Sequence, residues 1–156
     1  MTSTKKVIGK AATTRRLTHA VRDLLLAYKA TLEEAVRPHG LTLPQLRMLH
    51  AVSEQNEVSA ATIARLCHVT PQTLQAMLTR AVREGWIVRG TTQRNHRILT
   101  VSLTPEGENL LAIGQKAAIE IEDRMWSGVP RKALEETIEI LERGTAGVGA
   151  PRTEQC

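Results

Sequence analysis

The chain has 156 residues, which is enough for one ordinary domain and too few for two. Apolar residues make up 42% of it and charged residues 24%, so a continuous core can be buried beneath an ordinary surface. Aromatic residues are nearly absent, with no Phe, one Tyr and two Trp, so the core must be aliphatic. Modules that stack single-stranded bases on aromatic side chains are therefore disfavoured.

The positive charge of the chain is concentrated in one stretch. The whole chain carries 21 basic and 16 acidic side chains, a formal net charge of +5. Residues 59–101 hold six Arg and a single acid, Glu84, so this stretch alone supplies the excess. Because the Arg guanidinium is a planar fork that suits phosphates and base edges, the stretch indicates a polyanionic partner. The alternative is a solvated Arg-rich face.

The two cysteines, Cys67 and Cys156, have no metal-binding spacing, and a reducing compartment fits them. Cys67 falls on the inner face of a predicted helix, which favours a core role, while a redox role stays open. No apolar run approaches the roughly 18 residues that span a bilayer, and the N-terminus does not resemble a signal peptide. We expect a soluble, cytoplasmic protein without a metal site or cofactor.

The first part of the chain predicts two helices. Residues 1–13 are polar and basic and are expected to be flexible. Apolar side chains then recur at three- and four-residue spacing up to Val36, which predicts a long amphipathic helix that ends at Pro38-His39-Gly40. The sequence Thr42-Leu-Pro-Gln45 has the form of a capping box and predicts the start of a second helix.

The middle of the chain predicts a helix-turn-helix and a hairpin. Ser59 can cap a short third helix, and Thr70-Pro71 opens a fourth, which ends at Gly85. The buried face of the fourth helix is expected to hold Leu74, Met77, Leu78, Ala81 and Val82. Two β-rich runs, residues 86–89 and 98–103, then flank the polar loop 90–97. Residues 41–103 therefore predict a winged helix.

The last part of the chain predicts a fifth helix from Thr104-Pro105 and a sixth helix that ends near Arg143. Residues 144–156 are expected to form a disordered tail. Residues 1–58 carry nine basic and five acidic side chains, whereas 105–143 carry five and nine. Because these imbalances are complementary, we expect residues 14–40 and 105–143 to be dimerisation helices of a homodimer; packing within one chain would also satisfy their apolar stripes.

Three segments resemble the MarR family of transcriptional regulators, the multiple-antibiotic-resistance type. Residues 41–49 resemble its second helix, residues 70–85 its recognition helix, and residues 95–107 its wing and the helix after it. The resemblance covers about 14–143 as a single domain. It implies a mainly α fold with a small β-hairpin wing, in a homodimer that regulates transcription, typically a repressor released by a phenolic or carboxylate ligand.

The predicted wing departs from the family at one position. The family usually carries Asp-x-Arg there, and this chain has Asn95-His96-Arg97. The resemblance implies that Arg97 enters a minor groove, and Arg94 could compensate for the missing Asp. His96 could contact DNA or sit at an exposed turn.

The predicted recognition helix leaves a set of polar positions facing outward. Early positions suit the floor of the major groove, where Gln pairs with adenine and Thr or Ala meets a thymine methyl group; later ones suit phosphates. The expected contacts to double-stranded DNA, including those of the wing, are Gln72, Thr73, Gln75, Ala76, Thr79, Arg80, Arg83, Arg94, His96 and Arg97. Two such helices would read a pseudopalindrome with half-sites roughly 10 bp apart.

A small anionic effector could be bound by cationic side chains of the first two helices. The candidates are Arg15, Arg16, His19, Arg22 and His50, with ordinary surface charge as the alternative.

Two other classes of function remain for the whole chain. A winged-helix module for protein interaction or DNA architecture would lack a specific operator, and an enzyme is disfavoured because no catalytic set of residues is present.

Overall fold

The computed structural model describes residues 2–54, 60–91 and 99–149. Their order confirms a mainly helical fold with one two-stranded antiparallel hairpin. The elements are α1 (Thr2–Val36), the short 3-10 helix η1 (Arg37–His39), α2 (Leu43–Ser53), α3 (Ala60–Leu66), α4 (Pro71–Arg83), β1 (Ile87–Thr91), β2 (Leu99–Leu103), α5 (Pro105–Met125) and α6 (Arg131–Gly147).

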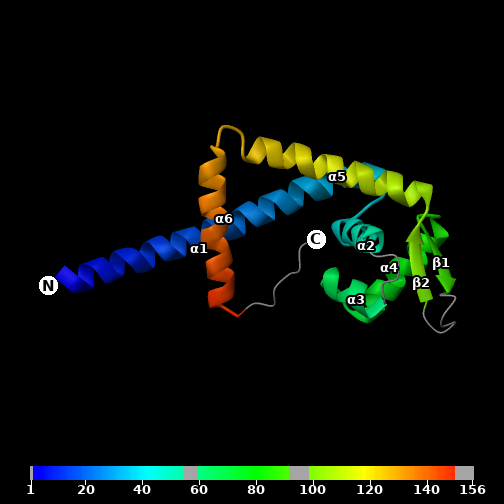
Figure 1. Ribbon diagram of the computed structural model, residues 1–156, viewed down its shortest axis with the longest axis horizontal. Helices are drawn as coiled ribbons and strands as arrows, with labels where there is room; N and C mark the ends of the chain where they lie inside the picture. Colours follow the sequence, from blue (N-terminus) through cyan, green and yellow to red (C-terminus); the bar gives the residue numbers. More distant parts are fainter. Residues whose placement is uncertain (1, 55–59, 92–98, 150–156) are drawn as a thin grey trace.

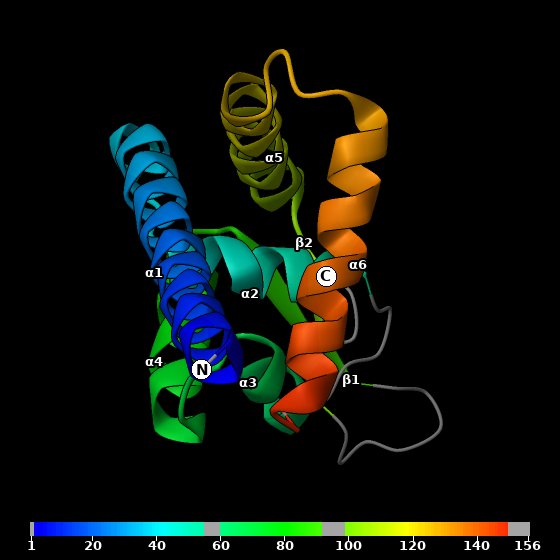
Figure 2. The same cartoon turned by 90° about the vertical axis from the view of Figure 1, so that its left-hand side faces the viewer.

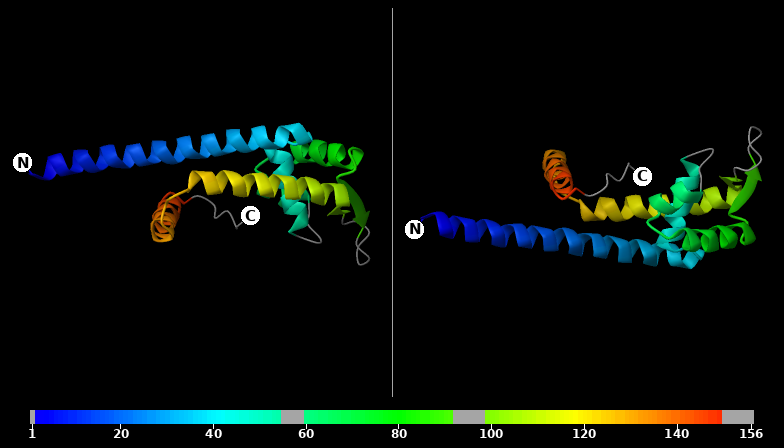
Figure 3. Two further views of the ribbon diagram at one scale, coloured as in Figure 1. Left: turned by 90° about the horizontal axis from the view of Figure 1, so that it is seen from above. Right: turned by 90° about the horizontal axis from the view of Figure 1, so that it is seen from below.

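The elements form a globular lobe with a long helical extension. In Figure 1, α2, α3 and α4 gather below the last turns of α1, and the hairpin lies at the far edge of this lobe. Helices α1 and α5 pack side by side and run in opposite directions, as the views from above and below show (Figure 3). Helix α6 then turns away from the end of α5 and stands across the direction of α1 (Figure 2).

The core is aliphatic, as the composition predicts. Its buried side chains come from helices α1 to α5 and from both strands, and the buried aromatic side chain is that of Trp86, with 7% of its surface exposed. The largest are Leu41, Met48, Leu49, Ile63, Leu74 and Ile87. Among the described residues, no helix is both long and apolar enough to cross a membrane.

Local capping sets several of the predicted boundaries. Gln45 Oε1 accepts a hydrogen bond of 3.0 Å from the Thr42 N–H, so the predicted start of α2 is confirmed. At the end of α4, Gly85 adopts the left-handed conformation with a φ of 75°. The Trp86 N–H donates to the Ala81 carbonyl at 2.8 Å and the Gly85 N–H to the Val82 carbonyl at 3.1 Å, which closes a Schellman motif.

Three expectations are wrong in detail. Helix α1 begins at Thr2 instead of near residue 14, because residues 2–13 contain no proline and include good helix formers such as Ala11 and Ala12. Helix α6 continues to Gly147, where a disordered tail was expected from residue 144. Val82 is 40% exposed, because it lies about 100° around α4 from the fully buried Ala81.

The start of α5 packs directly on the backbone that follows α4. A Cβ atom placed on Gly107 would collide with the Trp86 carbonyl oxygen. The same carbonyl accepts a hydrogen bond of 3.0 Å from the Thr104 N–H, and the Thr104 hydroxyl donates to the Gly85 carbonyl at 2.6 Å. Only glycine therefore lets α5 approach this closely.

We predict that Gly107→Ala destabilises the protein by about 1–3 kcal/mol, because the added methyl group must displace backbone atoms and not a flexible side chain. Denaturant unfolding followed by circular dichroism would measure the change. Gly144→Ala in α6 is the matched control, since a Cβ there meets nothing within 4 Å. An equal effect of the two substitutions would contradict the close packing of α5 on Trp86.

Candidate nucleic-acid interface

The turn between α3 and α4 is tightly closed. His68 has a φ of 53°, a left-handed conformation that is unusual outside glycine. The His68 N–H donates to the Arg65 carbonyl at 3.1 Å and the Val69 N–H to the Ala64 carbonyl at 3.0 Å, so α3 ends in a Schellman motif. The short connection confirms the predicted helix-turn-helix.

Thr70 begins α4 as its N-cap. Its hydroxyl oxygen accepts a hydrogen bond of 3.2 Å from the Thr73 N–H, and the two threonine hydroxyl oxygens lie 2.9 Å apart. The Thr73 hydroxyl, which was expected to face a base, therefore already has an intramolecular partner at the helix start.

Helix α4 buries one face and exposes the other. Leu74, Met77, Leu78 and Ala81 are buried in the lobe. The seven α4 residues expected to contact DNA are all exposed: Gln72, Thr73, Gln75, Ala76, Thr79, Arg80 and Arg83. At about 100° per residue, four of them form the strip directly opposite the core: Gln72, Ala76, Thr79 and Arg83. We call these four the outward strip.

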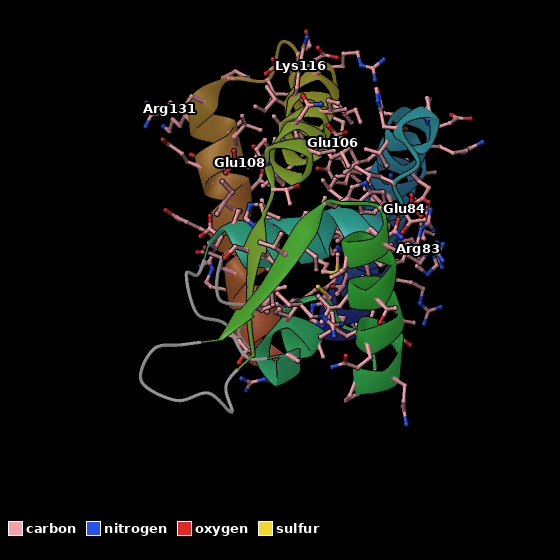
Figure 4. All side chains as sticks on the ribbon, turned by 90° about the vertical axis from the view of Figure 1, so that its right-hand side faces the viewer. Arg83, Glu84, Glu106, Glu108, Lys116 and Arg131 are labelled. Atoms are coloured by element: carbon pink, nitrogen blue, oxygen red, sulfur yellow. The ribbon has the colours of Figure 1, made fainter. Side chains whose placement is uncertain are left out.

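Glu84 is the acid closest to this strip in the sequence. It pairs with Arg83 at 2.9 Å, and both side chains are well exposed (Figure 4). An exposed pair of this kind contributes little to stability, so Arg83 can exchange it for a phosphate at small cost.

The hairpin follows α4 directly. Ile87 pairs with Leu103 and Arg89 with Val101 in the antiparallel register, and the buried Ile87 and Val101 anchor the stem to the core. Three predicted wing contacts, Arg94, His96 and Arg97, lie outside the described residues.

Two further arginines of the basic stretch are exposed on this lobe: Arg65, for which the sequence left a phosphate contact and a surface salt bridge equally open, and Arg89, which was not predicted as a contact. Arg65 lies on α3, where it donates to the Thr62 hydroxyl at 3.3 Å, and Arg89 lies on β1. The sequence feature that could have identified them is the basic stretch itself, because the charge excess there consists entirely of arginine.

The predicted effector residues are not brought together within the chain. Arg15, Arg16 and His19 are exposed on the first half of α1, and Arg22 pairs with its neighbour Asp23 at 2.8 Å. Leu32, where α1 is buried in the core, comes 17 residues after Arg15, which is about 25 Å along a helix. The hollow at Arg15 and His19 is lined by α1 alone, so it is an open helix surface.

His50, the fifth predicted effector residue, lies on α2 and is half-buried. Its Nδ1 atom is buried and has no hydrogen-bond partner among the described residues.

A polar contact that the sequence analysis missed joins α1 to α5. The Tyr28 hydroxyl donates a hydrogen bond of 3.2 Å to Glu122 Oε1. Burial raises the pKa of Tyr28 above its ordinary value, and the Glu122 carboxylate raises this pKa further.

Cys67 is 2% exposed, which confirms the prediction that it is part of the core. A thiol in this position is shielded from solvent.

The tight turn, the capped second helix with its exposed polar strip, and the hairpin beyond it define a winged helix-turn-helix of the DNA-binding class. The comparisons with known proteins agree with this assignment. The model of the MarR family matches residues 39–98 of the chain. These residues include the helix-turn-helix and β1.

A curated relative covers part of the chain. The HTH-type transcriptional repressor Rv2887 of Mycobacterium tuberculosis is 34% identical over 76 residues, which are 49% of this chain and 55% of the relative. The chain thus spans about half the length of the curated relatives it matches.

Solved structures share the fold over most of the chain. A MarR family regulator from Silicibacter pomeroyi superposes with a TM-score of 0.71 at 20% identity, over 87% of this chain and 92% of that one. CouR from Rhodococcus jostii RHA1, solved bound to p-coumaroyl-CoA, gives 0.70 at 18% identity, over 81% and 89%. The chain is similar to the MarR family of transcriptional regulators over residues 39–98, and its fold is the winged-helix fold of their solved structures.

We predict that Gln72→Ala weakens binding to a specific duplex by about 5- to 150-fold, because a Gln–adenine pair contributes roughly 1–3 kcal/mol of discrimination. Binding to a scrambled duplex should stay unchanged. Fluorescence anisotropy with both duplexes would measure the two affinities. The matched control is Gln115→Ala, an exposed glutamine on α5. Equal losses on both duplexes would contradict a base contact by Gln72.

Proposed function

We propose that this protein is a homodimeric regulator that binds double-stranded DNA in a sequence-specific manner, a repressor that a phenolic or carboxylate ligand releases. The outward strip on a helix held rigidly by its cap and its buried face is the observation that carries the proposal. Gln72 and Ala76 at the start of this strip suit base edges, and Arg83 at its end suits a phosphate. The Arg-rich stretch supplies the charge that DNA attracts.

A titration against duplex DNA from beside its own gene tests the proposal. If about eight phosphates are neutralised per dimer, the logarithm of the affinity should fall with the logarithm of salt concentration at a slope near −7. Scrambled duplex is the competitor. A slope near zero would contradict DNA binding.

Replacing Arg94 and Arg97 with Ala separates this proposal from a winged-helix module that binds a protein partner. A DNA-binding wing predicts weaker binding and a shallower salt slope for the double variant, whereas a protein-interaction module predicts no change in DNA retention.

The dimer is proposed from apolar surface that one protomer leaves uncovered. No residue of α6 is buried. Large apolar side chains of α1, α5 and α6 are exposed, among them Leu17 (49%), Leu25 (49%), Ile119 (57%) and Ile138 (53%). Apolar stripes of this extent on neighbouring helices are typical of protein interfaces. The opposite charge imbalances of the two ends of the chain favour the same pairing.

Helix α6 allows a matched test of the dimer. Leu134, Ile138 and Leu141 share one face of α6, and Ile140 lies about 200° around the helix from Ile138. Ile138→Glu should weaken the dimer at least about 100-fold, because the interface would bury an unpaired charge. Ile140→Glu is the control, since Ile140 is similarly exposed (49%) and off this face. Sedimentation equilibrium would measure both dissociation constants; equal effects would contradict an interface on the Ile138 face.

The effector site is proposed to need both protomers. Since Arg15, Arg16 and His19 lie far along α1 from the half-buried His50, the α1 helix of a second copy is required to bring such groups together. The ligand would act by favouring one separation of the two recognition helices over another. CouR is bound to p-coumaroyl-CoA, a ligand with a phenolic end. Simple phenolic carboxylates are therefore the first compounds to add to the DNA titration, and loss of the bound signal is the expected result.

A further inference from the structure

Arg80 differs from the other basic residues of α4 in what surrounds it. Its guanidinium carbon lies 5.8 Å from the centre of the Trp86 ring. One of its nitrogens, Nη2, donates to the Gly40 carbonyl at 3.4 Å. The first contact is a cation–π interaction, and the second reaches a residue forty positions away in the sequence. Both partners lie inside the protein's own fold.

The two partners of Arg80 belong to different parts of the molecule. Gly40 follows η1, directly after α1, and so marks the end of the long first helix. Trp86 is the residue on which α5 is seated, through the Thr104 hydrogen bond and the close approach of Gly107. Arg80 therefore connects α4 to the ends of both long helices.

The direction in which Arg80 leaves α4 agrees with these contacts. It lies about 60° around the helix from Arg83, on the flank of the outward strip. Glu84, four residues after Arg80, would be an available partner on the same helix, but it pairs with Arg83.

We propose that Arg80 is a positioning residue: it fixes the orientation of the recognition helix against the junctions with α1 and α5 and does not neutralise a phosphate. This inference rests on the proposed DNA binding and replaces the phosphate contact expected for Arg80 from the sequence. By holding the orientation of α4, Arg80 determines whether all the base contacts of a DNA site can form together. Its loss therefore lowers affinity for the specific duplex relative to the scrambled one. A phosphate contact would lower affinity for every sequence alike.

The test compares Arg80→Gln, Arg80→Lys and Arg83→Gln in the full chain. Each is titrated against the specific and the scrambled duplex over a range of salt, and thermal unfolding checks that each variant folds. Arg83→Gln removes the same charge from the same end of α4, at the residue proposed to contact a phosphate, so it reports the effect of losing a phosphate contact. Arg80→Lys keeps the charge and loses the planar group that stacks on Trp86.

For Arg80→Gln we expect specific affinity to fall about tenfold, with scrambled-duplex affinity and salt slope close to those of the wild type. Arg83→Gln should weaken binding to both duplexes alike and make the salt slope shallower by about 1.8, for two lost phosphate contacts per dimer. Arg80→Lys should not restore specificity. Rescue by lysine, or a salt slope for Arg80→Gln as shallow as that of Arg83→Gln, would overturn the positioning role. Unchanged specificity in Arg80→Gln would overturn it as well. A wild-type chain that retains no duplex would instead remove the proposed function itself.

A fluorescence measurement gives an independent readout. Trp86 and Trp126 are the two tryptophans of the chain, so Trp126→Phe leaves Trp86 as the single reporter. In that background Arg80→Gln should shift the Trp86 emission or its quenching by iodide, and Arg83→Gln should not. Identical spectra for Arg80→Gln and its parent would count against the stacked arrangement.

Discussion

The close seating of α5 on the carbonyl of Trp86 is the contact on which the arrangement of the molecule depends. It joins the end of the recognition helix to the start of the helix that leads out of the lobe. Because the contact involves backbone atoms on one side and a glycine on the other, it leaves little freedom for sliding or rotation. The Thr104 hydroxyl, bonded to the Gly85 carbonyl, holds the same junction from a second direction. The orientation of α4 is consequently fixed relative to α5.

This rigid packing also fixes where the charged side chains lie on the surface of the lobe. Arginines on α3, α4 and β1 are exposed on elements that pack on one aliphatic core, so their relative positions are set by buried neighbours such as Leu74 and Ile87. The ion pairs found among the described residues are all surface pairs, and they contribute little to stability. Apolar side chains inside the lobe therefore supply its stability, and exposed arginines supply the charge of its surface.

The sequence was most informative where structure is determined locally. The starts of α2 and α4, and the end of α4 at Gly85, depend on residues within three or four positions and were predicted correctly. The partners of Arg80 could not be predicted, because Gly40 reaches it only through the tertiary fold. The exposure of Val82 could not be predicted either, because helix periodicity does not say how wide a face of α4 the core covers. That Arg15 and His50 lie far apart within the chain could not be predicted either, because a helix pattern carries no information on how separate helices are placed.

The unbroken course of α1 has a mechanical consequence. Its 35 residues form a rod about 50 Å long, and its packed end, around Leu32 and Val36, leads directly into Gly40. The helix extends about 45 Å from Leu32 to its free end at Thr2, so a tilt of about 5° at the core moves that end by roughly 4 Å. Conversely, a contact that holds the free end sets the angle at which α1 meets the lobe. Because α1 is long, a weak contact at its free end is enough to change the orientation of the lobe, and with it the orientation of the DNA-reading surface.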